Sequence, residues 1–113
     1  FRPPRVRDFA TEFGIDEKEI RRILRLTQRL GRTDQIAHDH FFARPVTARM
    51  VAILREVAAA TEDGWFTAPL FRDRVQNGRK VAIEILDFFD RHGVTLRRGD
   101  LRRLNPHRLD QFD

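Results

Sequence analysis

The feature that most constrains the fold is a helical pattern joined directly to a two-stranded pattern in residues 79–104. In "RKVAIEILDFFDRHG" (79–93), apolar residues recur at the spacing of one helix face, and Gly93 is a typical helix stop. The next segment, "VTLRRGDLRRLN", alternates around Gly99 and Asp100, which predicts a β-hairpin with a tight turn. A helix followed at once by a hairpin is a compact supersecondary unit.

The residues before this unit complete a larger pattern. Residues 46–60 have helical spacing, and Trp65-Phe66 is a short apolar pair that predicts one strand. Thr67 is placed to cap a short helix with Pro69 in its first turn, and Asn77-Gly78 is expected to stop that helix. The order helix, strand, helix, turn, helix, hairpin is that of a winged helix.

The first half repeats most of this order. Residues 5–13 predict a short helix ended by Gly14, and Asp16 caps a second helix with a capping-box spacing to Glu19. Residues 32–44 alternate around His38-Asp39 as a second hairpin. The expected core face of the second helix carries its apolar residues and one threonine: Ile20, Ile23, Leu24, Leu26, Thr27 and Leu30.

The predicted fold is therefore mainly α with small β-hairpins (α+β), as two tandem winged-helix domains. Pro45 marks the boundary, which gives a partial winged helix at 1–45 and a C-terminal winged helix at 46–113, with a stiff joint between them. The first unit lacks its first helix. Because the chain opens on Phe1 rather than Met, we expect that helix to precede it in a longer protein.

Composition narrows the possible chemistry. Cysteine and serine are absent and no phosphate-binding Gly-x-x-x-x-Gly-Lys loop occurs, so disulfides, thiolate metal sites and serine or cysteine nucleophiles are excluded. His38 and His40 could face one side of a strand, but no third metal ligand is evident nearby. No segment predicts a membrane span or a signal peptide. We expect a cytoplasmic, monomeric binding module without cofactor, metal or catalytic residues.

Basic residues carry the functional signal, since the net charge is +5. Arg79 and Lys80 open the helix at 79–91, where free backbone N–H groups favour phosphate. In a winged helix this end lies near the wing, so Arg97, Arg98 and Arg102 are expected to converge with them on a nucleic-acid face. The alternative is a solvated basic patch whose arginines pair with Asp73 and Asp100.

Acidic residues near the wing allow two interpretations. Asp100 is either a turn residue or a carboxylate that orients Arg98 or Arg102 through a salt bridge, and the second is slightly favoured. The acids on the neighbouring helix are interpreted as solubilising charge: Glu84, Asp87 and Asp90.

Residues 71–106 carry a more specific pattern. They contain Phe71-Arg72-Asp73, Gly78-Arg79-Lys80, Asp90-Arg91-His92-Gly93 and the wing 95–102, "TLRRGDLR". This combination resembles the last winged-helix domain of the bacterial selenocysteine-specific translation elongation factor. Residues 5–44 resemble the preceding winged helix of that family only in general pattern. Many relatives carry an aromatic residue where this chain has Val81, which would weaken an RNA contact made by that ring.

The resemblance implies a function. Members of this family are GTPases that carry selenocysteyl-tRNA to the ribosome at UGA codons, and their last winged helix grips an mRNA hairpin, the selenocysteine insertion element. This chain would be the RNA tether of such a GTPase, with ribosome contact through the parent protein. The implied RNA-binding residues are Arg72, Asn77, Gly78, Arg79, Lys80, Arg97, Arg98, Asp100 and Arg102; in this set Gly78 permits close backbone approach and Asp100 shapes the wing.

Two other functions stay open from the residues. A tandem winged-helix DNA-binding module of a transcription regulator would insert helix 79–91 in the major groove, although three acids would then face the bases. A protein-interaction winged helix would bind no nucleic acid. The basic helix face of the first unit could touch the ribosome or serve as a spacer: Arg21, Arg22, Arg25 and Arg29.

Overall fold

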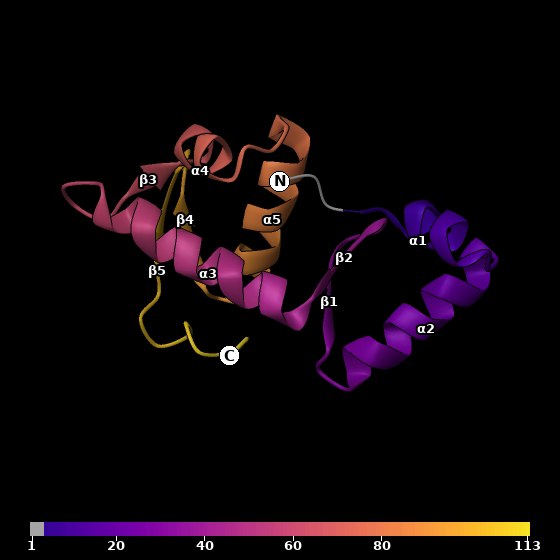
Figure 1. Ribbon diagram of the computed structural model, residues 1–113. Helices are drawn as coiled ribbons and strands as arrows, with labels where there is room; N and C mark the ends of the chain where they lie inside the picture. Colours follow the sequence, from indigo (N-terminus) through magenta and orange to yellow (C-terminus); the bar gives the residue numbers. More distant parts are fainter. Residues whose placement is uncertain (1–3) are drawn as a thin grey trace.

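The N-terminal end of the molecule is a pair of helices. A computed structural model describes residues 4–113, and in it α1 (Val6–Phe13) is followed by α2 (Glu17–Arg29) (Figure 1). Gly14 ends α1 at φ 63°, a left-handed conformation that glycine adopts without steric cost. Asp16 caps α2 by accepting a hydrogen bond from the Lys18 backbone N–H (3.2 Å). The expected capping box does not form, because Glu19 binds Arg22 instead.

The first hairpin links the two halves. Strands β1 (Thr33–Ala37) and β2 (His40–Ala43) pair antiparallel, and α3 (Arg44–Ala59) begins at the next residue. Phe41 packs with Val6 and Ile20 of the N-terminal helices, whereas Phe42 belongs to the larger core around α3. Adjacent strand residues point to opposite faces, so one hairpin serves two apolar clusters. The halves are therefore joined through a shared packed element instead of a linker.

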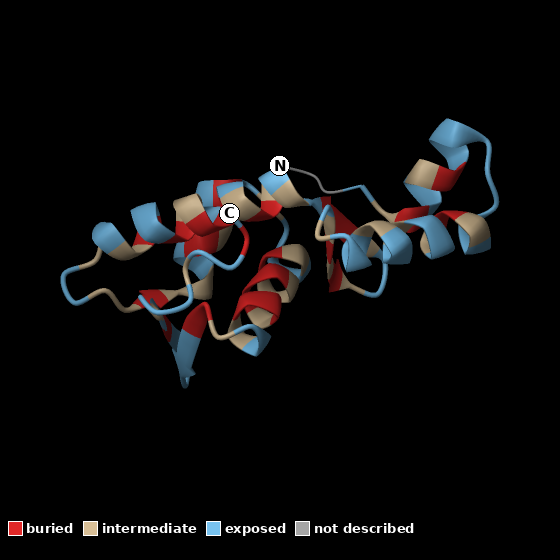
Figure 2. Cartoon of the chain, turned by 90° about the horizontal axis from the view of Figure 1, so that it is seen from below, coloured by how far each residue is buried: buried red, intermediate tan, exposed pale blue. Residues whose placement is uncertain are grey.

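The C-terminal half is a winged helix. After α3 come β3 (Phe66–Thr67), α4 (Ala68–Val75), α5 (Arg79–Arg91) and the wing strands β4 (Thr95–Arg98) and β5 (Leu101–Leu104). The three strands form an antiparallel sheet in the order β3-β5-β4. The core between sheet and helices is built from fully buried side chains, including Phe66, Phe71, Ile85, Leu86 and Phe89. Figure 2 colours the ribbon of buried residues red. These elements confirm the predicted α+β class.

The turn before α5 differs from the prediction. The residue that ends α4 is Gln76, in the left-handed conformation at φ 56°, and Gly78 is the N-cap of α5. Asn77-Gly78 therefore lies between the helices instead of stopping α4. The strand predicted at Trp65-Phe66 is shifted by one residue, and Thr67 precedes α4 without a side-chain capping bond.

The predicted core face of α2 is only partly buried. Ile20 is 5% exposed, but Ile23, Leu26 and Leu30 are 37%, 43% and 71% exposed. In the described chain, α1 and β1 contact α2, and they cover only one side of it. The helical spacing correctly identified an apolar face on α2. The prediction that this whole face is buried in a core is wrong. The helix expected before Phe1 and the division at residue 45 stay predictions.

The described part of the chain is elongated, with extents of 48, 27 and 21 Å. The α1–α2 pair lies at one end, the winged helix at the other, and the first hairpin between them (Figure 1). Among residues 4–113, no helix has the length and apolar character that crossing a membrane demands.

Candidate nucleic-acid interface

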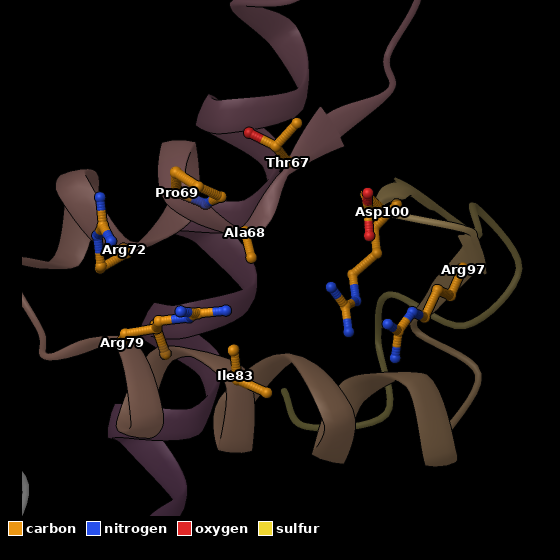
Figure 3. Close-up of a pocket in the computed structure, with 10 residues that line it drawn as sticks. Thr67, Ala68, Pro69, Arg72, Arg79, Ile83, Arg97 and Asp100 are labelled. Carbon is orange, nitrogen blue, oxygen red and sulfur yellow. The ribbon is translucent and has the colours of Figure 1, made fainter.

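A cleft of about 610 Å³ opens between α4, α5 and the wing. Four of its ten lining residues are arginines and four are apolar, and the apolar ones are here called its floor (Figure 3). It is lined by Thr67, Ala68, Pro69, Arg72, Arg79, Ala82, Ile83, Arg97, Asp100 and Arg102. The cleft thus gathers arginines that the sequence separates by up to 30 residues, and of the five basic residues expected to converge, Arg79, Arg97 and Arg102 line it.

Arg79 is the best-placed cation of this cleft. It is the first residue of α5, it is exposed, and it makes no ion pair or hydrogen bond within residues 4–113. The first turn of α5 contains no acidic residue, and its leading backbone N–H groups have no intrahelical partner. A free guanidinium and a helix N-terminus therefore lie at the same point, which favours a phosphate group.

Arg72 and Arg97 line the cleft and make only exposed contacts within the chain. The Nε of Arg72 lies 3.3 Å from the Asp73 carboxylate, with the Arg72 side chain 37% exposed. The Nε of Arg97 donates to the Gly99 carbonyl (3.0 Å), while its Nη1 lies 4.0 Å from Asp87. These exposed pairs contribute little to stability, so a ligand phosphate can replace them at low cost.

Arg102 has a different role from the other arginines. It is 3% exposed, and its Nε donates to both carboxylate oxygens of Asp90 (3.2 and 3.0 Å) while Nη2 donates to Asp87 (3.2 Å). The Thr95 hydroxyl also donates to Asp90 (2.5 Å). This network ties the wing to α5. The interpretation of Asp87 and Asp90 as solubilising charge is therefore wrong.

Other predicted partnerships also change. Glu84 faces His40, with 3.5 Å between Oε1 and Nδ1, so this acid lies in the joint between the two halves. Asp100 lines the cleft but makes no ion pair with Arg98 or Arg102 in the described chain. The salt bridge expected at the wing turn is absent there because Arg102 is held by the α5 carboxylates.

Four predicted residues do not line the cleft: Asn77, Gly78, Lys80 and Arg98. Lys80 lines a smaller cavity of about 450 Å³ with residues of the first hairpin, including His38 and His40. Arg98 does not line the cleft. Asn77 lies in the α4–α5 turn, and neither its buried Oδ1 nor its buried Nδ2 has a hydrogen-bond partner among residues 4–113.

Gly78 has open space around its Cα, since a Cβ built there would meet no atom within 4 Å. A ligand can therefore approach the backbone at this N-cap. Sequence reasoning missed the apolar floor of the cleft, notably Pro69 and Ile83. Ile83 is one of the apolar residues of the helical pattern at 79–93, so its place at the cleft gave no separate signal.

The basic face of α2 is partly neutralised. Arg21 donates to the His38 carbonyl (2.6 Å) and to Asp39 (3.0 Å), and this hydrogen bond lowers the pKa of the Asp39 carboxyl. Arg22 likewise lowers the pKa of Glu19 through a side-chain hydrogen bond. Arg25 and Arg29 make no such contact in the described chain. Residues 4–113 contain no group of three His, Asp or Glu side chains placed to hold a metal ion.

The sequence of this chain is similar to those of known proteins. The family model for the winged helix of elongation factor SelB matches residues 58–104. The chain is 39% identical over 95 residues to a selenocysteine-specific elongation factor of Escherichia coli, and 30% identical over 95 residues to that of Haemophilus influenzae. Each match covers 84% of this chain and 15% of the relative, so the chain spans about a seventh of their length.

A solved structure has the same fold over nearly the whole chain. The mRNA-binding domain of elongation factor SelB from E. coli, in complex with SECIS RNA, matches with a TM-score of 0.84 and 38% identity. The match covers 92% of this chain and 84% of that domain.

Proposed function

We propose that this chain, which belongs to the winged-helix family of elongation factor SelB, binds an mRNA hairpin of the selenocysteine insertion type. The observation that carries the proposal is the cleft, where unpaired Arg79 at the N-terminus of α5 faces the same space as Arg72 and Arg97. The solved relative was determined with SECIS RNA, which supports the same ligand here.

A hairpin loop suits this cleft better than a regular duplex. A-form RNA hides its base edges in a narrow major groove, so sequence-specific recognition uses unpaired loop nucleotides. In a tight loop the phosphates turn outward over a short arc, which three arginines around one cleft can contact together. The apolar floor at Pro69 and Ile83 offers a surface for one extruded base.

The rest of the proposed role rests on the similarity to selenocysteine-specific elongation factors. The chain would tether a GTPase that carries selenocysteyl-tRNA to the ribosome at UGA codons, and it would itself act as a monomer without cofactor. Its place of action would be the cytoplasm. The division into units 1–45 and 46–113 is part of the proposal, with the second unit holding the RNA.

The alternative of DNA reading by α5 has less support. Inserting α5 in a major groove would bring Glu84, Asp87 and Asp90 toward the DNA, and two of these carboxylates anchor the wing through Arg102. A DNA duplex is therefore expected to bind more weakly than the hairpin.

Fluorescence anisotropy tests the proposal with three labelled ligands at two salt concentrations. These are a selenocysteine insertion hairpin from a related bacterium, the same hairpin with a scrambled loop, and a DNA duplex. We expect scrambling to weaken binding at least about tenfold, and Arg79→Ala to weaken it about five- to tenfold through one lost charged contact.

A matched control is Arg55→Ala, which removes an exposed arginine of α3 outside the cleft. It is expected to leave affinity nearly unchanged. Arg79→Ala should also reduce the salt slope by about 0.7 to 0.9, the value of one neutralised phosphate. Equal affinity for all three ligands would overturn the proposal.

A further inference from the structure

The wing has a second face that the cleft does not use. Thr95 pairs with Leu104 and Arg97 with Arg102 on the side toward the helices. Because strand residues alternate between faces, the pairs Leu96–Arg103 and Arg98–Leu101 point the other way. These four residues, with Trp65 beside them, are here called the outer wing face.

The outer wing face is apolar yet uncovered. Leu96 and Leu101 are 42% and 39% exposed, whereas Thr95 and Arg102 on the opposite side are 2% and 3% exposed. The two leucines are diagonal to one another on this face, since Leu96 lies opposite Arg103 and Leu101 lies opposite Arg98. No other element within residues 4–113 buries them.

The two charged strand residues of this face are arginines, and Asp63 accepts a hydrogen bond from the backbone N–H of Trp65 at its edge (3.0 Å). Arg98 is exposed and makes no ion pair or hydrogen bond in the described chain. The Arg103 guanidinium lies 5.3 Å from the centre of the Trp65 ring, a cation–π contact that holds the planar group in place. None of the outward positions of β3, β4 or β5 carries a carboxylate.

We propose that the outer wing face binds an unpaired RNA segment. A base stacks on the fixed Arg103 plane, Arg98 contacts a phosphate, and the leucines cover a second base or ribose. Arginine planes over aromatic rings and unpaired cations are features that bind single strands. This site goes beyond the cleft; only the expectation that the polymer is RNA rests on the proposed function.

The position of this face supports RNA over a protein partner. Arg97 and Arg102 reach the cleft from the same two strands that carry Arg98 and Arg103 outward. An RNA strand that leaves the cleft around the Gly99-Asp100 turn therefore meets further cations. A protein partner would use the leucines and Trp65, but it would need carboxylates to match both arginines.

The experiment uses a built-in probe. Trp65 is the only tryptophan and the chain has no tyrosine, so intrinsic fluorescence reports on this face alone. An eight-nucleotide oligoadenylate is titrated into the protein while Trp65 emission is followed, and anisotropy of the labelled RNA gives affinity independently. We expect a saturable change in emission, and Arg103→Ala with Arg98→Ala to weaken binding about tenfold or more.

Two further variants separate the possible outcomes. Arg103→Lys keeps the charge but loses the stacking plane, so binding should fall nearly as far as in the alanine variant. Arg79→Ala should weaken the hairpin in the cleft while the oligoadenylate response persists. Thermal unfolding confirms that each variant is folded.

An unchanged Trp65 emission at saturating RNA would overturn the inference. Undiminished RNA affinity in the folded double variant would overturn it as well. If Arg79→Ala leaves hairpin binding intact, the proposed function fails, whereas the outer wing face does not.

Discussion

Asp90→Asn is expected to loosen the wing. Both carboxylate oxygens of Asp90 share the Arg102 Nε–H, Asp90 also accepts from the Thr95 hydroxyl, and Arg102 is 3% exposed. An amide in place of the carboxylate removes the negative charge that compensates this buried cation. Breaking one partner of a buried pair typically costs 3 to 5 kcal/mol, because the other charge stays uncompensated.

A second carboxylate, that of Asp87, reduces the stability that Asp90→Asn is expected to lose. Asp87 still accepts from the Arg102 Nη2 at 3.2 Å, and the Asp90 side chain is itself 19% exposed. We therefore expect a loss of about 2 to 3 kcal/mol in the free energy of unfolding. For a domain of this size that is a fall in Tm of roughly 10 °C. Asp87→Asn should cost below about 1 kcal/mol, because Asp90 keeps the Arg102 contacts.

Chemical denaturation followed by circular dichroism measures both variants. The account predicts a clear order, with Asp90→Asn far less stable than Asp87→Asn. Equal stability of the two variants, or an unchanged Asp90→Asn protein, would refute the reasoning that Asp90 anchors the wing through Arg102.

Three further predictions address separate contacts. Asp87→Asn should raise affinity for hairpin RNA about two- to fivefold by anisotropy, because Arg97 loses a competing carboxylate 4.0 Å away; weaker binding would contradict this. Arg21→Ala should raise the pKa of Asp39 toward its ordinary value in an NMR titration. Since the Asp39 pKa is lowered in the fold, its contribution to stability is present above the unfolded pKa and is lost as pH falls; an unmoved titration would refute it. Gln76→Gly should change the free energy of unfolding by less than about 1 kcal/mol, whereas Gln76→Val should lower it by over about 1 kcal/mol at φ 56°; equal stabilities would contradict the assigned turn.

Secondary structure was largely predictable because its signals are local. The apolar spacing of 79–91 and the Gly99-Asp100 turn define α5 and the wing without help from distant residues. The covering of α2 was not predictable in the same way. Spacing shows that Ile23 and Leu30 share a face, but it contains no information on which element packs there.

The sequence predicted which arginines meet in the candidate site, but it did not predict the ion pairs that they form. Arg79 at a helix start and Arg97 on the wing were expected to meet, and the cleft brings them together. The ion pairs of Arg102 depend on the distance between two elements, which composition does not reveal. The separation of Arg97 from Arg98 was available from strand alternation, because neighbouring residues of a strand face opposite sides.

NMR of the arginine side chains during addition of the selenocysteine insertion hairpin tests the central claim most directly. We expect the Nε–H signals of Arg72, Arg79 and Arg97 to shift with one common affinity, while that of Arg102 stays at its free position. If the Arg79 signal stays unmoved while RNA binds, the cleft is not the RNA site and the account is contradicted.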